Sequence, residues 1–273
     1  RVFANRLWQF HFGRGIVPSP NDFGQLGEPS THPELLDWLA AELMDGGWKV
    51  KRMHRLIMLS TAYRMSSRAS PDALALDPAN QLFWRFPMRR LTAEEVRDAI
   101  LTASGELNPK AGGRSVRPPI SDEVLAGQSV PGKGWDVSPP SEAARRSVYV
   151  HVKRSLLLPI LATHDAADTD SSCPVRYTTT VSTQALGFLN SAFTNEQAAK
   201  LADRLEASRP GDLSSQIREA IVLTTCREPD SDEVARDSAF IGSLKTESGM
   251  SDHSALVQYC LLTLNANAFL YLD

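Results

Sequence analysis

The sequence predicts a mainly α fold, in which several helices pack in an orthogonal or bundle-like arrangement, together with a long central loop and a small β-ribbon. Three observations predict this class. Apolar residues recur at helical spacing through residues 1–107 and again through residues 183–273. Between residues 108 and 141, 11 of 34 residues are Gly or Pro, which is typical of a loop. A strict alternation of apolar and polar residues, the pattern of a β-strand, occurs near residue 150.

The first two helices are predicted from apolar faces and end signals. In the first, one face carries Val2, Phe3, Leu7 and Phe10, and the glycines after residue 12 end the helix. The second begins at a predicted capping box of Thr31 and Glu34, with Pro33 in its first turn. Its inward stripe is Leu36, Leu39, Ala40 and Leu43.

Two further helices complete the N-terminal part. One places Val50, Met53 and Ile57 inward and its basic residues outward. The other begins at a second predicted capping box, formed by Thr92 and Glu95. Its apolar positions follow i, i+3, i+4, i+7 spacing: Val96, Ala99, Ile100 and Ala103.

The middle part combines the Gly- and Pro-rich loop with a short strand. Val148, Val150 and Val152 alternate with polar residues. Because one strand cannot form a sheet, we expect a small ribbon in which this strand pairs with part of the loop. A segment rich in Ser, Thr and Asp follows, from residue 163 to residue 183.

Helices are predicted again at about 183–191, 195–207, 213–226, 231–245 and 253–266. Thr194 and Gln197 form a predicted cap. The chain is interpreted as one domain, residues 1–273, with a helical part (1–107), a loop-and-ribbon part (108–182) and an acidic helical part (183–273). Residues 182–273 carry 7 basic and 13 acidic side chains, a net charge of −6.

Composition excludes several classes of protein. The 273 residues carry 29 Lys and Arg against 32 Asp and Glu, which argues against a dedicated nucleic-acid binder. The three cysteines have no metal-ligand spacing and no Cys-x-x-Cys-His motif. No apolar run approaches the roughly 18 to 20 residues that a membrane helix requires. The chain opens at Arg1 without an initiator Met, so we interpret it as a piece of a longer protein.

The side chains that could best bind a ligand or a metal ion lie after the Gly- and Pro-rich loop. A ligand site there would draw on His151, Asp165, Asp168, Asp170 and Arg176, because closely spaced carboxylates supply oxygen ligands. Asp and Ser are also common turn formers for purely backbone reasons. No catalytic residue and no metal ligand set is assigned. A third interpretation is non-covalent haem or metal binding, with His54 and Met58, which share a helix face, as the candidate haem ligands.

Several phrases together resemble a known family: RLWQFHFGRGIV (6–17), NDFG (21–24), EPSTHPELLDWLA (28–40), STAYR (60–64), RRLTAEEVRDAI (89–100), RRSVY (145–149), TQALGFLN (183–190) and NAFLYLD (267–273). The chain resembles the planctomycete-specific domain of unknown function at the C-terminus of planctomycete cytochrome-c-like multidomain proteins. This resemblance covers essentially the whole chain.

The resemblance implies an extracytoplasmic (periplasmic or secreted) setting and upstream domains in the same polypeptide, among them a cytochrome-c-type module. Any haem would belong to those upstream domains, and no cofactor is expected in this chain. The leading hypothesis is a non-catalytic helical interaction or accessory domain of such a protein. The alternative is an extracellular enzyme or a domain that binds glycan or metal, with its site at the central loop and the Asp-rich segment 164–176. Neither a nucleic-acid partner nor a transmembrane segment is expected.

Overall fold

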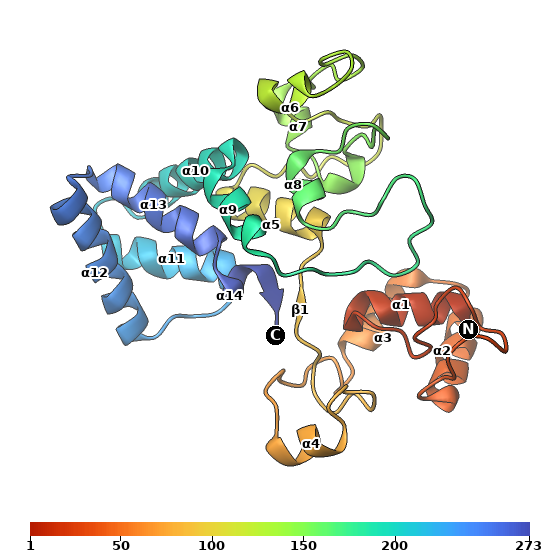
Figure 1. Ribbon diagram of the computed structural model, residues 1–273. Coiled ribbons are helices and arrows are strands. Elements are labelled where there is room, and N and C mark those ends of the chain that lie inside the picture. Colours follow the sequence, from red (N-terminus) through yellow and green to blue (C-terminus); the bar gives the residue numbers. More distant parts are fainter. The chain divides into compact units, whose positions relative to one another are not determined.

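The computed structural model describes residues 1–273 and confirms the mainly α class. It contains 14 α-helices and one two-stranded antiparallel ribbon (Figure 1). None of the helices combines the length and the apolar composition that crossing a bilayer requires. The chain divides into two compact units, residues 1–90 with 271–273 (unit 1) and residues 91–270 (unit 2).

Unit 1 is built from four helices and the ribbon. The helices are α1 (Val2–Phe12), α2 (Pro33–Asp45), α3 (Val50–Met58) and α4 (Pro71–Leu76). The strands β1 (Arg89–Arg90) and β2 (Tyr271–Leu272) pair antiparallel. Helices α1, α2 and α3 pack on one another around a core that includes Trp8, Phe12, Leu39, Met53 and Ile57. The predicted end of α1 is confirmed, because Gly13 closes it with a φ of 75°, a conformation that glycine adopts without a steric penalty.

Two details of unit 1 differ from the prediction. Val2, Phe3 and Phe10 are 48%, 43% and 69% exposed, because the buried face of α1 is the one that carries Ala4, Leu7, Trp8 and Phe12. Thr31 does not cap α2. The N-cap is His32, and the Thr31 hydroxyl donates instead to the carbonyl of Ile16 at 3.2 Å.

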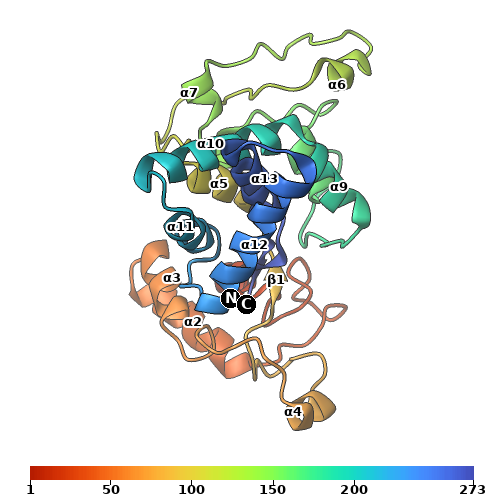
Figure 2. The same ribbon diagram turned by 90° about the vertical axis from the view of Figure 1, so that its left-hand side faces the viewer.

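Unit 2 contains ten α-helices. They are α5 (Ala93–Ser104), α6 (Asp122–Ala126), α7 (Pro140–Ala143), α8 (Pro159–Thr163), α9 (Ser182–Asn190), α10 (Ala192–Ser208), α11 (Leu213–Thr225), α12 (Ser231–Ser248), α13 (Asp252–Leu264) and α14 (Asn267–Leu270). Helices α10 to α13 lie side by side (Figures 1 and 2). Their core joins that of α5 through fully buried side chains that include Ile100, Leu201, Leu205, Ile217 and Leu264.

Of the two helix N-caps predicted for unit 2, the structure confirms one and places the other at a different residue. The predicted capping box of α5 is confirmed, because the Thr92 side chain accepts from the Glu95 N–H and Glu95 accepts from the Thr92 N–H. The predicted cap at Thr194 is wrong. Helix α10 begins earlier, at Ala192, and its N-cap is Ser191, whose side chain accepts from the Thr194 N–H. Thr194 itself is fully buried.

The ribbon exists, but its position was predicted wrongly. Residues 147–149 form a short 3₁₀ turn, so Val148 and Val152 are exposed while Val150 is buried. The segment still meets the central loop in one isolated bridge, where the His151 N–H donates to the Val116 carbonyl at 2.7 Å. A single bridge between irregular segments cannot propagate into a sheet, because each further pair would need extended backbone on both sides.

Candidate functional site

The acidic residues of the predicted ligand site are engaged by their own loop. The carboxylate of Asp165 accepts from the N–H and the hydroxyl of Thr179, at 2.9 and 2.8 Å. Asp168 accepts from the Asp170 N–H at 2.9 Å and from the Ser171 hydroxyl at 3.2 Å. Asp170 also forms an ion pair with Arg154. These contacts are the turn-forming role that short polar side chains have in loops.

The other two predicted residues face different partners. Arg176 donates to Glu94 of α5, with 3.0 Å between Nη2 and Oε1. Burial, the largest single effect, raises the pKa of Glu94, but the hydrogen bond and charge of Arg176 and a backbone hydrogen bond together outweigh it, so the pKa of this carboxyl lies below its usual value. Nδ1 of His151 lies 3.4 Å from the Ser115 hydroxyl, and its ring lies near Trp135.

The structure therefore gives these five residues no shared metal-ligand set. Within segment 164–176, no three His, Cys, Asp or Glu side chains bring ligand atoms within 4.8 Å of one another. Of the candidate haem ligands, His54 places Nδ1 2.8 Å from Nε2 of His11, and Met58 is 45% exposed.

A pair of buried arginines, Arg97 and Arg145, anchors the central loop, although no motif or spacing in the sequence predicts this role. Arg97 of α5 is 1% exposed. Its guanidinium donates to the carbonyls of Arg145 at 2.9 Å and Ala143 at 2.6 Å, and to the Ser147 hydroxyl at 3.2 Å. Burial lowers the pKa of Arg97 to about 10, which still leaves it charged at neutral pH. The RRSVY segment contains the second arginine, Arg145, which follows the Gly- and Pro-rich loop in the sequence.

Arg145, also 1% exposed, continues this anchor into the loop. Its guanidinium donates to the carbonyls of Lys110 and Arg114, each at 3.2 Å, and to that of Gly112. Its guanidinium carbon also lies 4.0 Å from the centre of the Tyr149 ring, a cation–π contact. Carbonyls of an irregular loop have no helix or sheet partner, and the five donors of an arginine can satisfy several of them at once.

The strongest candidate for a functional surface lies in unit 1, between α1 and α2. A pocket of about 540 Å³ opens there, lined by Arg1, Val2, Phe3, Asp37, Ala40, Leu43, Met44 and Trp48. Leu43 is 3% exposed and Ala40 is 9% exposed, whereas Phe3, Met44 and Trp48 are 43%, 54% and 62% exposed. We call this surface, with its eight lining residues, the apolar pocket.

Local sequence explains why this surface stays uncovered. Phe3 lies on the side of α1 away from the core, as described above. Trp48 follows Gly46 and Gly47 at the end of α2 and has a φ of 60°, a strained value for a residue with a side chain. Arg1 and Asp37 form an ion pair at the pocket, so charged groups border the apolar surface. The Asp37 pKa is below its usual value because its carboxylate accepts from Arg1.

Comparison with known proteins identifies a family but no characterised relative. A family model described as PSD1, a protein of unknown function (DUF1553), matches residues 1–241. No curated protein and no solved structure matches the chain.

Proposed function

We propose that this chain, which belongs to the PSD1 family of proteins of unknown function (DUF1553), acts as a non-catalytic helical interaction domain. The proposal is based on its surface. The observation that carries this proposal is the apolar pocket. Its three large exposed side chains, Phe3, Met44 and Trp48, belong to residue types that are enriched at protein interfaces. A contiguous apolar surface on a folded protein is typical of a docking site, whereas isolated exposed apolar residues are not.

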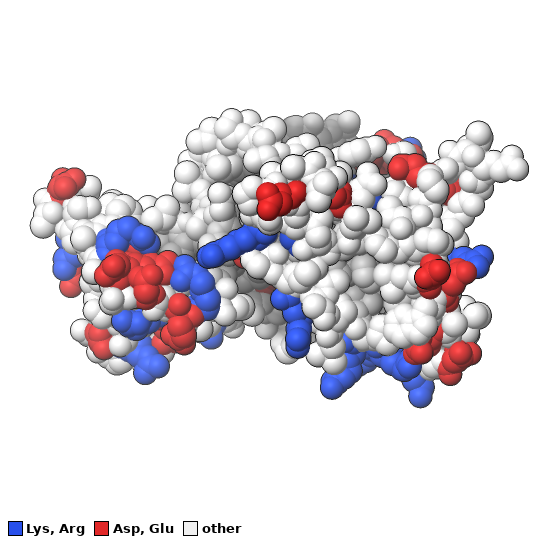
Figure 3. Space-filling model, turned by 90° about the horizontal axis from the view of Figure 1, so that it is seen from below, with Lys and Arg blue, Asp and Glu red and all other residues white.

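The surroundings of the pocket favour a protein partner. Charged groups border an apolar centre, with the Arg1–Asp37 pair beside Phe3 and Trp48, and protein interfaces have this arrangement. On the face that Figure 3 shows, basic and acidic side chains lie next to each other in mixed groups. Nucleic-acid binders instead present a long basic stripe.

The partner we propose is an apolar surface of another domain of the same polypeptide, as the resemblance to cytochrome-c-like multidomain proteins implies. Tethering raises the effective concentration of a partner to the millimolar range for a short linker, so a modest interface is enough. We further propose an extracytoplasmic location and assign any haem to the cytochrome-c-type module. Both proposals rest on the resemblance.

The test measures binding of the 273-residue chain to the remaining polypeptide encoded by its gene, produced separately, by calorimetry. The variant M44S/W48S removes two exposed side chains of the pocket without touching the core. We expect it to weaken binding at least tenfold, because buried aromatic and Met side chains dominate interface energies. The matched control L76S/L82S changes two exposed apolar residues of unit 1 outside the pocket, 88% and 65% exposed, and should leave binding unchanged. Absent binding, or equal loss in both variants, would refute the proposal.

A further inference from the structure

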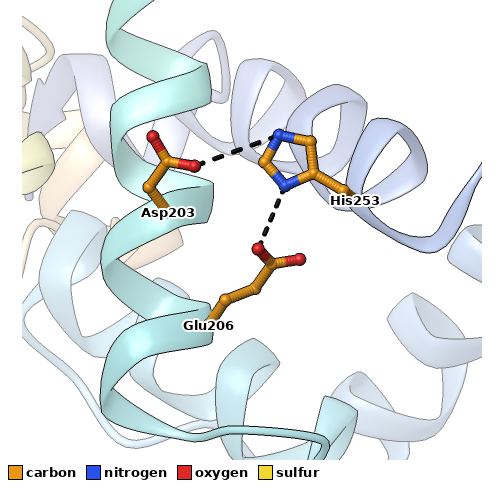
Figure 4. A group of neighbouring side chains, drawn as sticks. All are labelled: Asp203, Glu206 and His253. Atoms are coloured by element: carbon orange, nitrogen blue, oxygen red, sulfur yellow. Dashed lines mark hydrogen bonds and ion pairs between the residues drawn. The ribbon is translucent and has the colours of Figure 1, made fainter.

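We propose that Asp203, Glu206 and His253 form a binding site for a divalent transition-metal ion, for which Zn²⁺ is the probe. One imidazole nitrogen and two carboxylates are ligands that such ions accept. The three ligand atoms lie within 4.8 Å of one another, and Figure 4 shows the imidazole between the two carboxylates. This site lies in unit 2 and is independent of the apolar pocket.

Helix geometry brings the three side chains together. Asp203 and Glu206 are three residues apart on α10, so they lie on the same face of that helix. His253 lies in the first turn of α13, and its Nδ1 is 3.1 Å from Oε2 of Glu206. Its Nε2 is 4.0 Å from Oδ1 of Asp203. Ligands 2.0 to 2.2 Å from one ion stand roughly 3 to 4 Å apart, so changes of side-chain rotamer suffice to close the site.

The backbone under these side chains is held by packing. Leu201, Ala202 and Leu205 of α10 pack in the same core as Ala255 and Leu256 of α13, and all five are at most 2% exposed. The three ligands project from the rim of this contact and are themselves 41% to 61% exposed. An ion from solvent can therefore reach them, while the two helices that carry them stay in place.

Charge supplies an independent reason for a cation here. Neither Asp203 nor Glu206 pairs with a Lys or an Arg, and His253 is the partner of both. When the imidazole is neutral, two negative charges remain without a counter-charge, and a divalent ion would neutralise them.

An ion bound here would link α10 to α13. In this structure the two carboxylates face different ring nitrogens, so the ion would take one nitrogen and one carboxylate would reorient toward it. Three protein ligands leave at least one position for water. The competing arrangement has no metal: a protonated His253 would bridge the two carboxylates as a charged pair between the helices.

The experiment uses the 273-residue chain after treatment with EDTA and removal of the chelator. Zn²⁺ is titrated at pH 7.5 by calorimetry, and the unfolding temperature is recorded with and without Zn²⁺. We expect one ion per chain at this site and a higher unfolding temperature with Zn²⁺, because an ion that binds only the folded state stabilises it. H253Q and E206Q should each weaken Zn²⁺ binding at least tenfold.

The matched control is E196Q, which changes an exposed carboxylate on the same helix outside the triad. It should bind Zn²⁺ like the unchanged chain. Zn²⁺ binding that survives in H253Q and E206Q would place the ion elsewhere and overturn the proposal. No Zn²⁺ binding, with a lower unfolding temperature in H253Q at pH 6 than in the unchanged chain, would identify the metal-free charged bridge and also overturn it.

Discussion

The guanidinium of Arg97 donates a hydrogen bond of 2.9 Å to the backbone carbonyl of Arg145, and the side chains of both arginines are almost fully buried. The first arginine comes from helix α5, and the second extends into the Gly- and Pro-rich region. Together they connect the helical core of unit 2 to a loop whose regular structure is limited to the short helix α6 and isolated bridges. These hydrogen bonds, together with the buried side chains of Val116 and Trp135, hold the loop against the rest of unit 2.

Replacing Arg97 with Met should lower the free energy of unfolding by roughly 3 to 5 kcal/mol, because removing a buried charged donor leaves its buried partners unsatisfied. Urea denaturation followed by circular dichroism measures this change. The control is R154M, which removes the exposed Arg154–Asp170 pair and should cost less than about 1 kcal/mol. Equal costs for the two variants would contradict the anchoring role of Arg97.

Replacing Arg145 with Lys should loosen the loop while leaving the helices folded. Lysine keeps the charge but offers a single ammonium group, which cannot reach the carbonyls of Lys110, Gly112 and Arg114 together as the planar guanidinium does. Limited proteolysis with subtilisin should then cut residues 108–141 at least several times faster than in the unchanged chain. The control R146K alters the neighbouring exposed arginine, and its cutting rate should not change.

Unit 1 should lose stability as the pH falls through about 6.5. Burial, the neighbouring His54 and the charge of Arg89 lower the pKa of His11 in the folded protein. The unfolded chain keeps the ordinary value of about 6.5, so between the two pKa values it binds more protons than the folded chain. Stability is therefore complete above pH 6.5 and decreases below it.

Urea midpoints at pH 7.5, 6.5 and 5.5 measure this effect, recorded by tryptophan fluorescence, to which unit 1 contributes four of the five tryptophans. The variant H11N removes the titrating group, so its midpoint should change less over this range than that of the unchanged chain. If both midpoints shifted equally, the pH dependence would come from other groups.

The three cysteines should differ in reactivity. Cys173 and Cys226 are exposed and Cys260 is buried. Burial raises the pKa of the Cys260 thiol, and the thiolate is the reactive form. Iodoacetamide at pH 8 should therefore label two sites in the folded chain and a third only after denaturation, as mass spectrometry would record. Labelling of Cys260 in the folded chain at the rate of Cys173 would contradict its burial among α10 and α13.

The sequence by itself determined the helical class, the stripe of α2, the capping box of α5 and the glycine that ends α1. Each of these depends on residues within about four positions of one another, where backbone geometry and hydrophobic periodicity act directly. Residues this close in sequence do not decide which face of α1 is buried and which is exposed. Phe3 and Trp8 are both large aromatic residues, and only the packing of α2 and α3 decides which of them is covered.

Only the tertiary structure brought together the groups on which the proposals rest. His253 lies 47 positions from Glu206, and Trp48 lies 45 positions from Phe3, spacings that follow no local period. The predicted ligand residues from His151 to Arg176 are near in sequence, yet Arg176 faces Glu94, 82 positions away. Side-chain partners depend on how helices pack, and that packing is the sum of many long-range contacts which no short stretch of sequence encodes.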